Sequence, residues 1–260
     1  MTEYAHQELG GTFGHVGVAT AYEHRAPYPS EVFDVLVGLI ADEPATVLDL
    51  GAGEGAIARP LATRVDRVDA LDISAAMVEA GRERPGGDQP NLRWVEGAAE
   101  TAELAGPYAL VTAGASLHWM EWATTMPRLV KVMTQPAQLA VVEHGPRGVP
   151  WRDAITEVIR QHSRSQGYDT RFDIVDALRD RGLFEPGGSV ETEPTPFRQA
   201  VTDYVEQFHS RASLAREHMS PEEAAAFDRA VEDVVRPYAV DGLLELPVVA
   251  SIRWGRPLAP

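Results

Sequence analysis

Five short apolar segments alternate with longer segments of helical periodicity between residues 30 and 143, and this alternation limits the fold more than any other feature of the chain. The apolar segments lie at 46–50, 67–72, 91–96, 108–113 and 137–143. The helical segments lie at 30–43, with Ser30 as the predicted N-cap, and at 55–64, 75–84 and 120–133. Strands that alternate with helices form a parallel sheet with helices on both faces. The sequence therefore predicts an α/β fold.

The rest of the chain has a different pattern. Helical segments predominate, at 151–165, 172–182, 201–217 and 221–236, and two strand candidates remain at 189–200 and 246–254. The two strands could close the sheet as an antiparallel pair, which brings the predicted sheet to seven strands. The helices at 201–236 would then form an insertion between the closing strands, in a place that suits a cap over a substrate.

The segment VLDLGAGEGAIARPLA, residues 47–62, joins the first predicted strand to the next helix. In an open parallel sheet, ligands bind beyond the carboxyl ends of the strands, where this loop must lie. Gly51, Gly53 and Gly55 can adopt positive φ angles and let a ligand approach the main chain, and the following helix offers free N–H groups. The alternative is an ordinary tight turn between a strand and a helix.

A carboxylate ends the second predicted strand. Asp72 lies 21 residues beyond Gly51, and an acid at this place can accept two hydrogen bonds from the diol of a ribose. The alternative is an acid favoured by the dipole of the next helix, with Ser74 as the N-cap. Together, the glycine loop and Asp72 predict a ligand that carries a nucleoside.

Two nucleoside-bearing ligands fit this loop. Residues 51–56 match G-x-G-x-x-A, which is typical of dinucleotide sites, whereas residues 49–55 read D-x-G-x-G-x-G. Asp49 and Glu54 would repel the pyrophosphate of a dinucleotide. S-adenosylmethionine has no phosphate, and its sulfonium and ammonium groups favour negative charge nearby. The charge of the loop therefore favours S-adenosylmethionine and leaves an NAD-type dinucleotide as the alternative.

Composition argues against several other classes of function. The 260 residues carry a formal net charge of −16 and include no cysteine, so disulfides and thiolate metal sites are excluded, and no basic patch stands out that would grip nucleic acid. The histidines lack metal-ligand spacing, and we expect no metal. No apolar segment resembles a signal core or reaches membrane length. We predict a cytoplasmic protein with a small-molecule substrate and with no nucleic-acid or membrane partner.

Several ordered stretches resemble motifs of the class I S-adenosylmethionine-dependent methyltransferases, and most closely their small-molecule, trans-aconitate methyltransferase-like branch. They are VLDLGAGEG, ALDISAAMVEAG (70–81), WVEGAAE (94–100) and LVTAGASLHWM (110–120), with AYEHRAPYP (21–29) as a fifth. The resemblance covers roughly residues 12–145. It implies a Rossmann-like, mostly parallel seven-stranded sheet with an antiparallel last strand. The expected layout is a single domain over 1–260, with a cofactor-binding core at about 30–145, an N-terminal lid at 1–29, and closing strands with the helical cap at 146–260.

The resemblance also implies roles for single residues. Gly51, Ala52 and Gly53 would face the methionine part of S-adenosylmethionine, and Asp72 would hold the ribose hydroxyls. The other implied cofactor contacts are Ile73 and Met77 at the adenine, Ala98, Ala99 and Glu100 at the adenine edge, Ala113 beneath the sulfonium, and Arg25 at the cofactor carboxylate. The alternative for Met77 is a helix methionine buried in the core. Relatives often carry a polar residue where Ala98 stands, so a side-chain bond to adenine is not implied there.

Two histidines are the candidates for catalysis. Methyl transfer from a sulfonium needs a base only if the acceptor arrives protonated. His118 follows the fourth predicted strand on the side where ligands bind, and an imidazole is suited to proton removal near neutral pH. The alternative is that His118 only bonds the backbone or the cofactor. His144 ends the fifth predicted strand and is the second candidate.

These features predict methyl transfer from S-adenosylmethionine to a small molecule in secondary metabolism. Oxygen is favoured as the acceptor atom over nitrogen or carbon. Three alternatives remain open: an NAD-type oxidoreductase, an enzyme that uses S-adenosylmethionine for cyclisation or rearrangement, and a non-catalytic module that binds a nucleoside.

Overall fold

The structure, a computed structural model, describes residues 16–163 and 172–259. The chain forms two compact units. The sheet unit consists of Tyr28–His144, Arg171–Thr192 and Ala250–Pro260, and the helical unit consists of Met1–Pro27, Gly145–Thr170 and Glu193–Val249. The predicted cofactor-binding core at about 30–145 has nearly the same bounds as the first segment of the sheet unit. Half of the predicted lid lies outside the described residues, and the single-domain layout stays a prediction.

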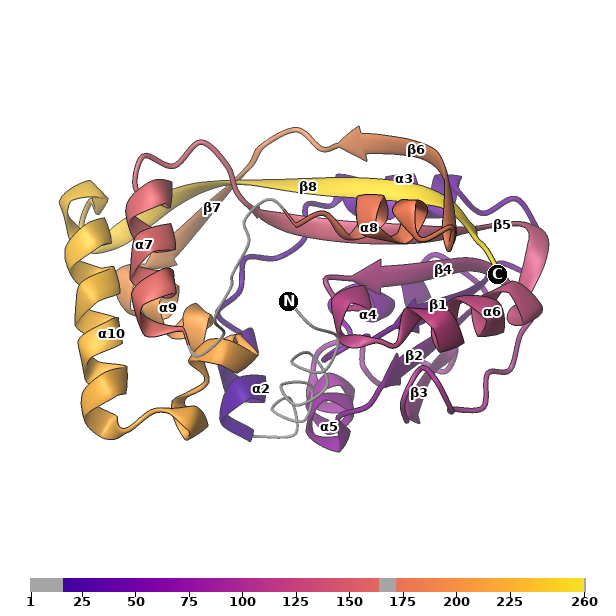
Figure 1. The fold of residues 1–260 in the computed structure, drawn as a ribbon, viewed down its shortest axis with the longest axis horizontal. Coiled ribbons are helices and arrows are strands. Elements are labelled where there is room, and N and C mark those ends of the chain that lie inside the picture. Colours follow the sequence, from indigo (N-terminus) through magenta and orange to yellow (C-terminus); the bar gives the residue numbers. More distant parts are fainter. Residues whose placement is uncertain (1–15, 164–171, 260) are drawn as a thin grey trace. The chain divides into compact units, whose positions relative to one another are not determined.

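The sheet unit is built on strands in the order β3-β2-β1-β4-β5-β8-β6 (Figure 1). Their bounds are β1 Thr46–Leu50, β2 Arg67–Asp72, β3 Leu92–Glu96, β4 Tyr108–Gly114, β5 Met133–Pro146, β6 Phe184–Glu191 and β8 Leu243–Pro257. β1 pairs in parallel with β2 and β4, β2 with β3, and β4 with β5, whereas β6 and β8 are antiparallel. The predicted mostly parallel sheet with antiparallel strands near the C-terminus is confirmed. An eighth strand, β7 (Thr195–Ala200), pairs with the first part of β8 in the helical unit.

Alternate residues of the strands serve two cores, because successive side chains of a strand point to opposite faces of the sheet. Leu48 and Leu50 pack with α6 (Trp122–Val132) and α8 (Ile174–Asp180). Val47 packs in a second cluster with α3 (Glu31–Gly38) and α4 (Ala58–Ala62). Helix α5 (Ala75–Glu83) belongs to this second face, because its Gly81 lies against Trp94 of the same cluster. Helices therefore cover both faces, as predicted.

The helical unit has its own apolar core. Helices α7 (Arg152–His162), α9 (Val201–Glu206) and α10 (Pro221–Val235) contribute to a cluster that includes Phe208 and Phe227, whose rings meet edge to face at 6.0 Å. Helix α2 (Val16–Tyr22) contacts the 3-10 turn η3 (Gln207–Ser210) within the same unit. Ser220 and Glu223 form a capping box at the start of α10, which fixes where this helix begins.

The predicted helix at 201–217 is wrong beyond Glu206. The chain continues in three 3-10 turns, η3, η4 (Ala212–Leu214) and η5 (Arg216–His218). Side chains explain the break: His209 Nδ1 contacts the Leu214 carbonyl at 2.7 Å, and Ser210 Oγ donates to the Gln207 carbonyl. Such bonds from side chains to the backbone compete with helical hydrogen bonds.

Two further expectations are corrected. The predicted strand at 189–200 is two strands, β6 and β7, with Pro194 in the segment between them; proline has no N–H to donate to a ladder. Ser30 occupies the N-cap position of α3 but has helical dihedral angles and makes no side-chain cap bond. Over the described ranges, no helix combines the length and the apolar character that a membrane crossing requires.

Candidate functional site

The loop after β1 leaves its main chain open at one position. Gly51, Gly53 and Gly55 have φ angles of 69°, 58° and 81°, in the region that side chains disfavour. A Cβ atom on Gly51 would lie 2.5 Å from the Cβ of Ser116, and one on Gly55 would lie 2.6 Å from the Trp94 ring. A Cβ on Gly53 would meet nothing within 4 Å. The outer two glycines are therefore needed for packing, and Gly53 is where a ligand can approach the backbone.

Asp72 connects this loop to the end of β2. Its Oδ2 accepts the Gly53 N–H at 2.7 Å, and its Oδ1 accepts the Ser74 N–H at 2.8 Å. Burial raises the pKa of the Asp72 carboxyl, and these two hydrogen bonds oppose the shift. Each oxygen keeps a second lone pair, so the side chain can still accept bonds from a ribose diol. Ser74 caps α5 by accepting the Met77 N–H at 3.2 Å. The prediction that Ser74 is the N-cap of the helix after β2 is therefore confirmed.

The two residues implied at the adenine differ in exposure. Ile73 is 63 % exposed although it is a large apolar side chain beside a buried strand, and such a residue is free to pack on an aromatic base. Met77 is 1 % exposed. Its burial favours packing in the core over contact with a ligand.

Residues 98–100 lie next to Asp72. The Gly97 N–H donates to the Asp72 carbonyl at 2.9 Å, and Arg128 Nε donates to the Ala99 carbonyl at 3.1 Å. The Glu100 carboxylate accepts the Glu121 N–H at 2.7 Å, at the start of α6. These bonds fix the segment at the same edge of the sheet as the glycine loop, and its contact with an adenine stays a prediction.

Asp49, near the end of β1, and Glu54, in the glycine loop, differ in burial and in the groups that they contact. Asp49 is 1 % exposed; its Oδ1 accepts the Thr112 hydroxyl at 2.8 Å, and its Oδ2 has no hydrogen bond among the described residues. Burial raises the pKa of Asp49 to about 7. Glu54, in contrast, pairs with Arg84 Nε at 2.5 Å and with Arg59 Nη2 at 3.8 Å. The expectation that Glu54 offers its charge to a cationic ligand is therefore wrong, because two guanidinium groups already neutralise it.

The segment after β4 lies at the carboxyl ends of the parallel strands, beside the glycine loop. Ala113 is fully buried within the sheet, and Ala115 has a positive φ of 49°, which is strained for a residue with a side chain. Ser116 Oγ donates to the Leu50 carbonyl at 2.6 Å and so ties this segment to the glycine loop. His118 follows in η2 (Leu117–Trp119), half-buried, with its ring 4.7 Å from that of Trp119. The structure thus brings His118 to the same end of the sheet as Gly51, Gly53 and Asp72.

His144 lies elsewhere on this edge. Its ring is 3.8 Å from the ring of Tyr28, which also approaches Gly114. Neighbouring residues of a strand face opposite sides, so His144 and Glu143 point to different faces of β5. The catalytic roles of His118 and His144 stay predictions.

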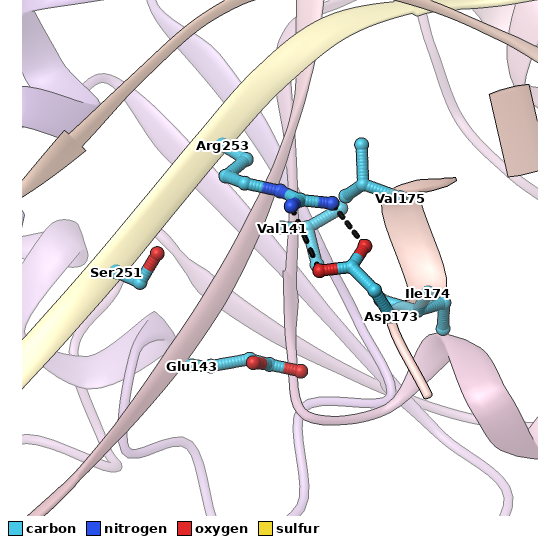
Figure 2. A pocket seen from close by; sticks show the side chains of 7 residues that line it. All are labelled: Val141, Glu143, Asp173, Ile174, Val175, Ser251 and Arg253. Carbon is cyan, nitrogen blue, oxygen red and sulfur yellow. Dashed lines mark hydrogen bonds and ion pairs between the residues drawn. The ribbon is translucent and has the colours of Figure 1, made fainter. Parts of the chain in front are cut away.

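A pocket opens on the Glu143 side (Figure 2), and no motif in the sequence predicts it. Its lining comes from β5, β8 and the start of α8: Val141, Glu143, Asp173, Ile174, Val175, Ser251 and Arg253. Arg253 donates to both oxygens of Asp173, with Nη1 2.8 Å from Oδ2. Although burial opposes it, bonds from the Asp176 N–H and Arg253 hold the pKa of Asp173 below its ordinary value. The two partners are 80 residues apart, so only the folded chain reveals the pair.

Arg25 belongs to the helical unit. Its Nε donates to Ser210 Oγ at 2.7 Å and its Nη2 to the Ser210 carbonyl at 3.3 Å, while its guanidinium carbon lies 3.9 Å from the centre of the Tyr22 ring. Its contact with a cofactor carboxylate stays a prediction. In the part of the chain that the structure describes, no group of three or more His, Cys, Asp or Glu side chains is arranged to hold a metal ion.

Comparison with known proteins agrees with this geometry. Residues 47–135 match the family described as "Methyltransferase domain". A malonyl-[acyl-carrier protein] O-methyltransferase of Anoxybacillus flavithermus is 29 % identical over 132 residues, which is 50 % of each chain. A trans-aconitate 2-methyltransferase of Azoarcus sp. is 31 % identical over 111 residues, which is 42 % of each chain. The matched part of the chain thus spans about half the length of these curated relatives or less.

Solved structures share the fold. A candidate type II methyltransferase of Anaeromyxobacter dehalogenans has a TM-score of 0.62 at 19 % identity, with 89 % of this chain and 97 % of that chain covered. A methyltransferase of Thiobacillus denitrificans, solved with S-adenosylhomocysteine, has a TM-score of 0.54 at 14 % identity, with 93 % and 97 % covered. The family match and the sheet agree with each other. Residues 47–135 of this chain match a methyltransferase domain, and the sheet that carries them has the Rossmann-like fold of class I, S-adenosylmethionine-dependent methyltransferases.

Proposed function

We propose that this protein transfers the methyl group of S-adenosylmethionine to a small-molecule acceptor. The observation that carries the proposal is the hydrogen bond between Asp72 and the Gly53 N–H, beside the exposed Ile73. At this place an acid that can bind the ribose lies beside an open stretch of main chain for the methionine part. The exposed Ile73 offers an apolar surface for the adenine. No feature of the described residues favours the NAD-type alternative over this one.

The residues of the site would mainly bind and align. When bound, S-adenosylmethionine supplies a methyl group that is already activated by the sulfonium, so the protein needs to hold acceptor and cofactor in line and exclude water. Asp72 and the Gly53 backbone would hold the nucleoside and the methionine part. His118, at the same edge, would take a proton from an acceptor that arrives protonated.

We further propose an oxygen acceptor, and within that class a carboxylate. The two curated relatives are named for malonyl and aconitate groups, both carboxylic acids, and one name specifies O-methylation. A carboxylate arrives ionised at neutral pH and would leave His118 as a polar pocket residue instead of a base. The role in secondary metabolism and the cytoplasmic location stay predictions.

Thermal unfolding tests the cofactor first. S-adenosylhomocysteine at about a hundred times its Kd should stabilise the protein by about 2.7 kcal/mol and raise the Tm by several degrees, whereas NAD should not. Asp72→Asn should abolish the rise, and Glu79→Gln, on the exposed side of α5, should keep it. A rise with NAD alone would refute the proposal.

An acceptor screen tests the reaction. We expect transfer of labelled methyl groups to one or more small carboxylic acids, at a rate that His118→Ala changes little. A strong loss in His118→Ala with unchanged cofactor binding would instead assign His118 as the base for a protonated acceptor. Cofactor consumption without methylated product would favour the cyclisation or rearrangement alternative, and binding without turnover would favour a non-catalytic module.

A further inference from the structure

His209 lies in the core of the helical unit with both of its ring nitrogens in contact with oxygen atoms. Its side chain is 2 % exposed. Nδ1 lies 2.7 Å from the Leu214 carbonyl oxygen, and Nε2 lies 2.7 Å from Oδ1 of Asp228 on α10. A carbonyl oxygen and an ionised carboxylate can only accept hydrogen bonds. Both ring nitrogens must therefore donate, and only the positively charged imidazolium carries a proton on each of them.

Asp228 keeps its own charge and so cannot act as the donor. Its Oδ2 accepts a bond from Arg216 Nη1 at 3.0 Å. Although burial opposes it, the bond from His209 and the charge of Arg216 hold the pKa of Asp228 below its ordinary value. A neutral imidazole would turn a nitrogen lone pair toward this carboxylate or toward the Leu214 carbonyl. Such a contact between two buried acceptors is costly.

The charges around His209 balance only when the ring is protonated. Arg216 Nη2 lies 2.6 Å from Oε2 of Glu206, at the end of α9. The row from Glu206 through Arg216 and Asp228 to His209 thus alternates in sign, and loss of the proton leaves one net negative charge beside the Phe227 ring, 5.4 Å away. Other titratable or charged side chains on the surrounding elements are Tyr22, His162, Asp203, Tyr204, Arg211, Glu217 and His218.

The segment 207–218, which His209 closes onto α10, also holds the first described part of the chain. Ser210 accepts Arg25 Nε on its hydroxyl at 2.7 Å and Arg25 Nη2 on its carbonyl at 3.3 Å. Helix α2 contacts both η3 and η5. Any rearrangement of 207–218 therefore reaches Arg25 and α2 within the same unit.

We propose that His209 is a pH-sensitive switch: as an imidazolium it links Leu214 to Asp228 and keeps 207–218 folded against α10, and loss of its proton to solvent releases this segment together with Arg25 and α2. Because the closed arrangement binds a proton that the open one does not, closure and protonation favour each other by the same factor. The switch does not depend on methyl transfer.

Nuclear magnetic resonance of the full chain, labelled with 15N in its imidazole rings, tests the protonation state. A free imidazole is about nine-tenths neutral at pH 7.5. We expect His209 to carry protons on both nitrogens at this pH, with its signals assigned by their loss in His209→Gln. A neutral His209 ring at pH 7.5 in the folded wild-type protein overturns the proposal.

Hydrogen exchange tests the release. As the pH rises through the loss of the His209 proton, the protection of amides at 207–218 and 17–25, corrected for intrinsic exchange rates, should fall at least tenfold, while that of β1 should not. In Asp228→Asn the transition should move down by about one pH unit or more. Asp233→Asn, at an exposed acid on the same helix, should leave it in place.

Two further results would contradict the switch. One is protection of 207–218 that stays constant while His209 titrates, which would make the proton irrelevant to the fold of this segment. The other is the same transition in Asp228→Asn and in the wild-type protein. If Asp228→Asn does not fold, the wild-type protonation state and exchange decide between the outcomes.

Discussion

Asp49 and Asp72 show how the local environment separates two acids at the ends of neighbouring strands. Asp72 accepts two backbone N–H groups, which lower the cost of its charge. Asp49 is more deeply buried, and burial raises its pKa although the Thr112 hydroxyl and the Ala58 N–H oppose the shift. The sequence predicts both acids near the carboxyl ends of their strands, where the structure has them, but it does not distinguish their environments. The difference depends on donors that come from other segments, such as Thr112 on β4.

The raised pKa of Asp49 predicts a dependence of stability on pH. The unfolded carboxyl loses its proton near the ordinary value of 3.8, while the folded one keeps it until about pH 7. Stability is therefore full below about pH 4, falls as the pH rises toward 7, and is constant above. The loss is roughly 4 kcal/mol at most. The unfolding free energy of the wild-type protein, measured with denaturant relative to Asp49→Asn, should fall over this range; a constant difference would contradict the shift.

At the scale of elements, Trp94 on β3 determines how closely α5 can approach the sheet. Its ring lies where a Cβ of Gly81 or Gly55 would be, and its Nε1 donates to the Gly87 carbonyl at 2.9 Å. The ring of Trp94 therefore packs against α5 and the glycine loop and also bonds the turn after α5. Residues 81 and 55 must both lack a side chain for this packing.

We expect Gly81→Ala to destabilise the protein. The added methyl carbon would lie 2.1 Å from the Trp94 ring, and overpacking of this kind costs about 1–3 kcal/mol, more than the roughly 1 kcal/mol that alanine contributes in a helix. Gly38→Ala in α3 is the matched control, because nothing lies within 4 Å of its Cβ position. Chemical denaturation should show Gly81→Ala less stable than wild type and Gly38→Ala at least as stable. Equal stability of both variants would show that the ring can move.

Strands and helices with a clear pattern of apolar residues could be predicted from the sequence. Segments whose backbone is determined by hydrogen bonds from side chains could not. β1 and β2 match their predicted bounds because each is a buried apolar run. The helix predicted at 201–217 ends early because His209 and Ser210 bond the backbone. At the candidate site, the predicted residues Gly53, Asp72 and Ile73 lie together at one edge of the sheet, and their contact with a cofactor stays a prediction. The sequence did not reveal that Arg84 neutralises Glu54 or that Arg253 pairs with Asp173, since neither pair is close in sequence.

At the scale of the whole molecule, the chain passes repeatedly between the two units. β5 and β8 each include residues of both units, and the implied cofactor residues divide between them, with Arg25 in the helical unit and the others in the sheet unit. Binding of one ligand can therefore report whether both units contribute to the site.

Hydrogen exchange with and without S-adenosylhomocysteine measures this contribution. We expect slower exchange at 51–56, 72–77 and 97–102, because a bound ligand stabilises the loops that contact it. If Arg25 meets the cofactor carboxylate, protection extends to 22–27, and Arg25→Ala removes it there. Protection confined to the sheet unit would exclude Arg25 from the cofactor site.

The bond from the Gly53 N–H to Asp72 has a consequence for inhibitor chemistry. Because one carboxylate already links the glycine loop to the end of β2, the spacing between the two is set before a ligand arrives, and little ordering remains to oppose binding. A preorganised site of this kind tolerates changes in shape poorly. Nucleoside analogues that lack a ribose hydroxyl would lose a hydrogen bond to Asp72 that the fixed loops cannot replace, so selectivity should come more easily from the sugar than from the base.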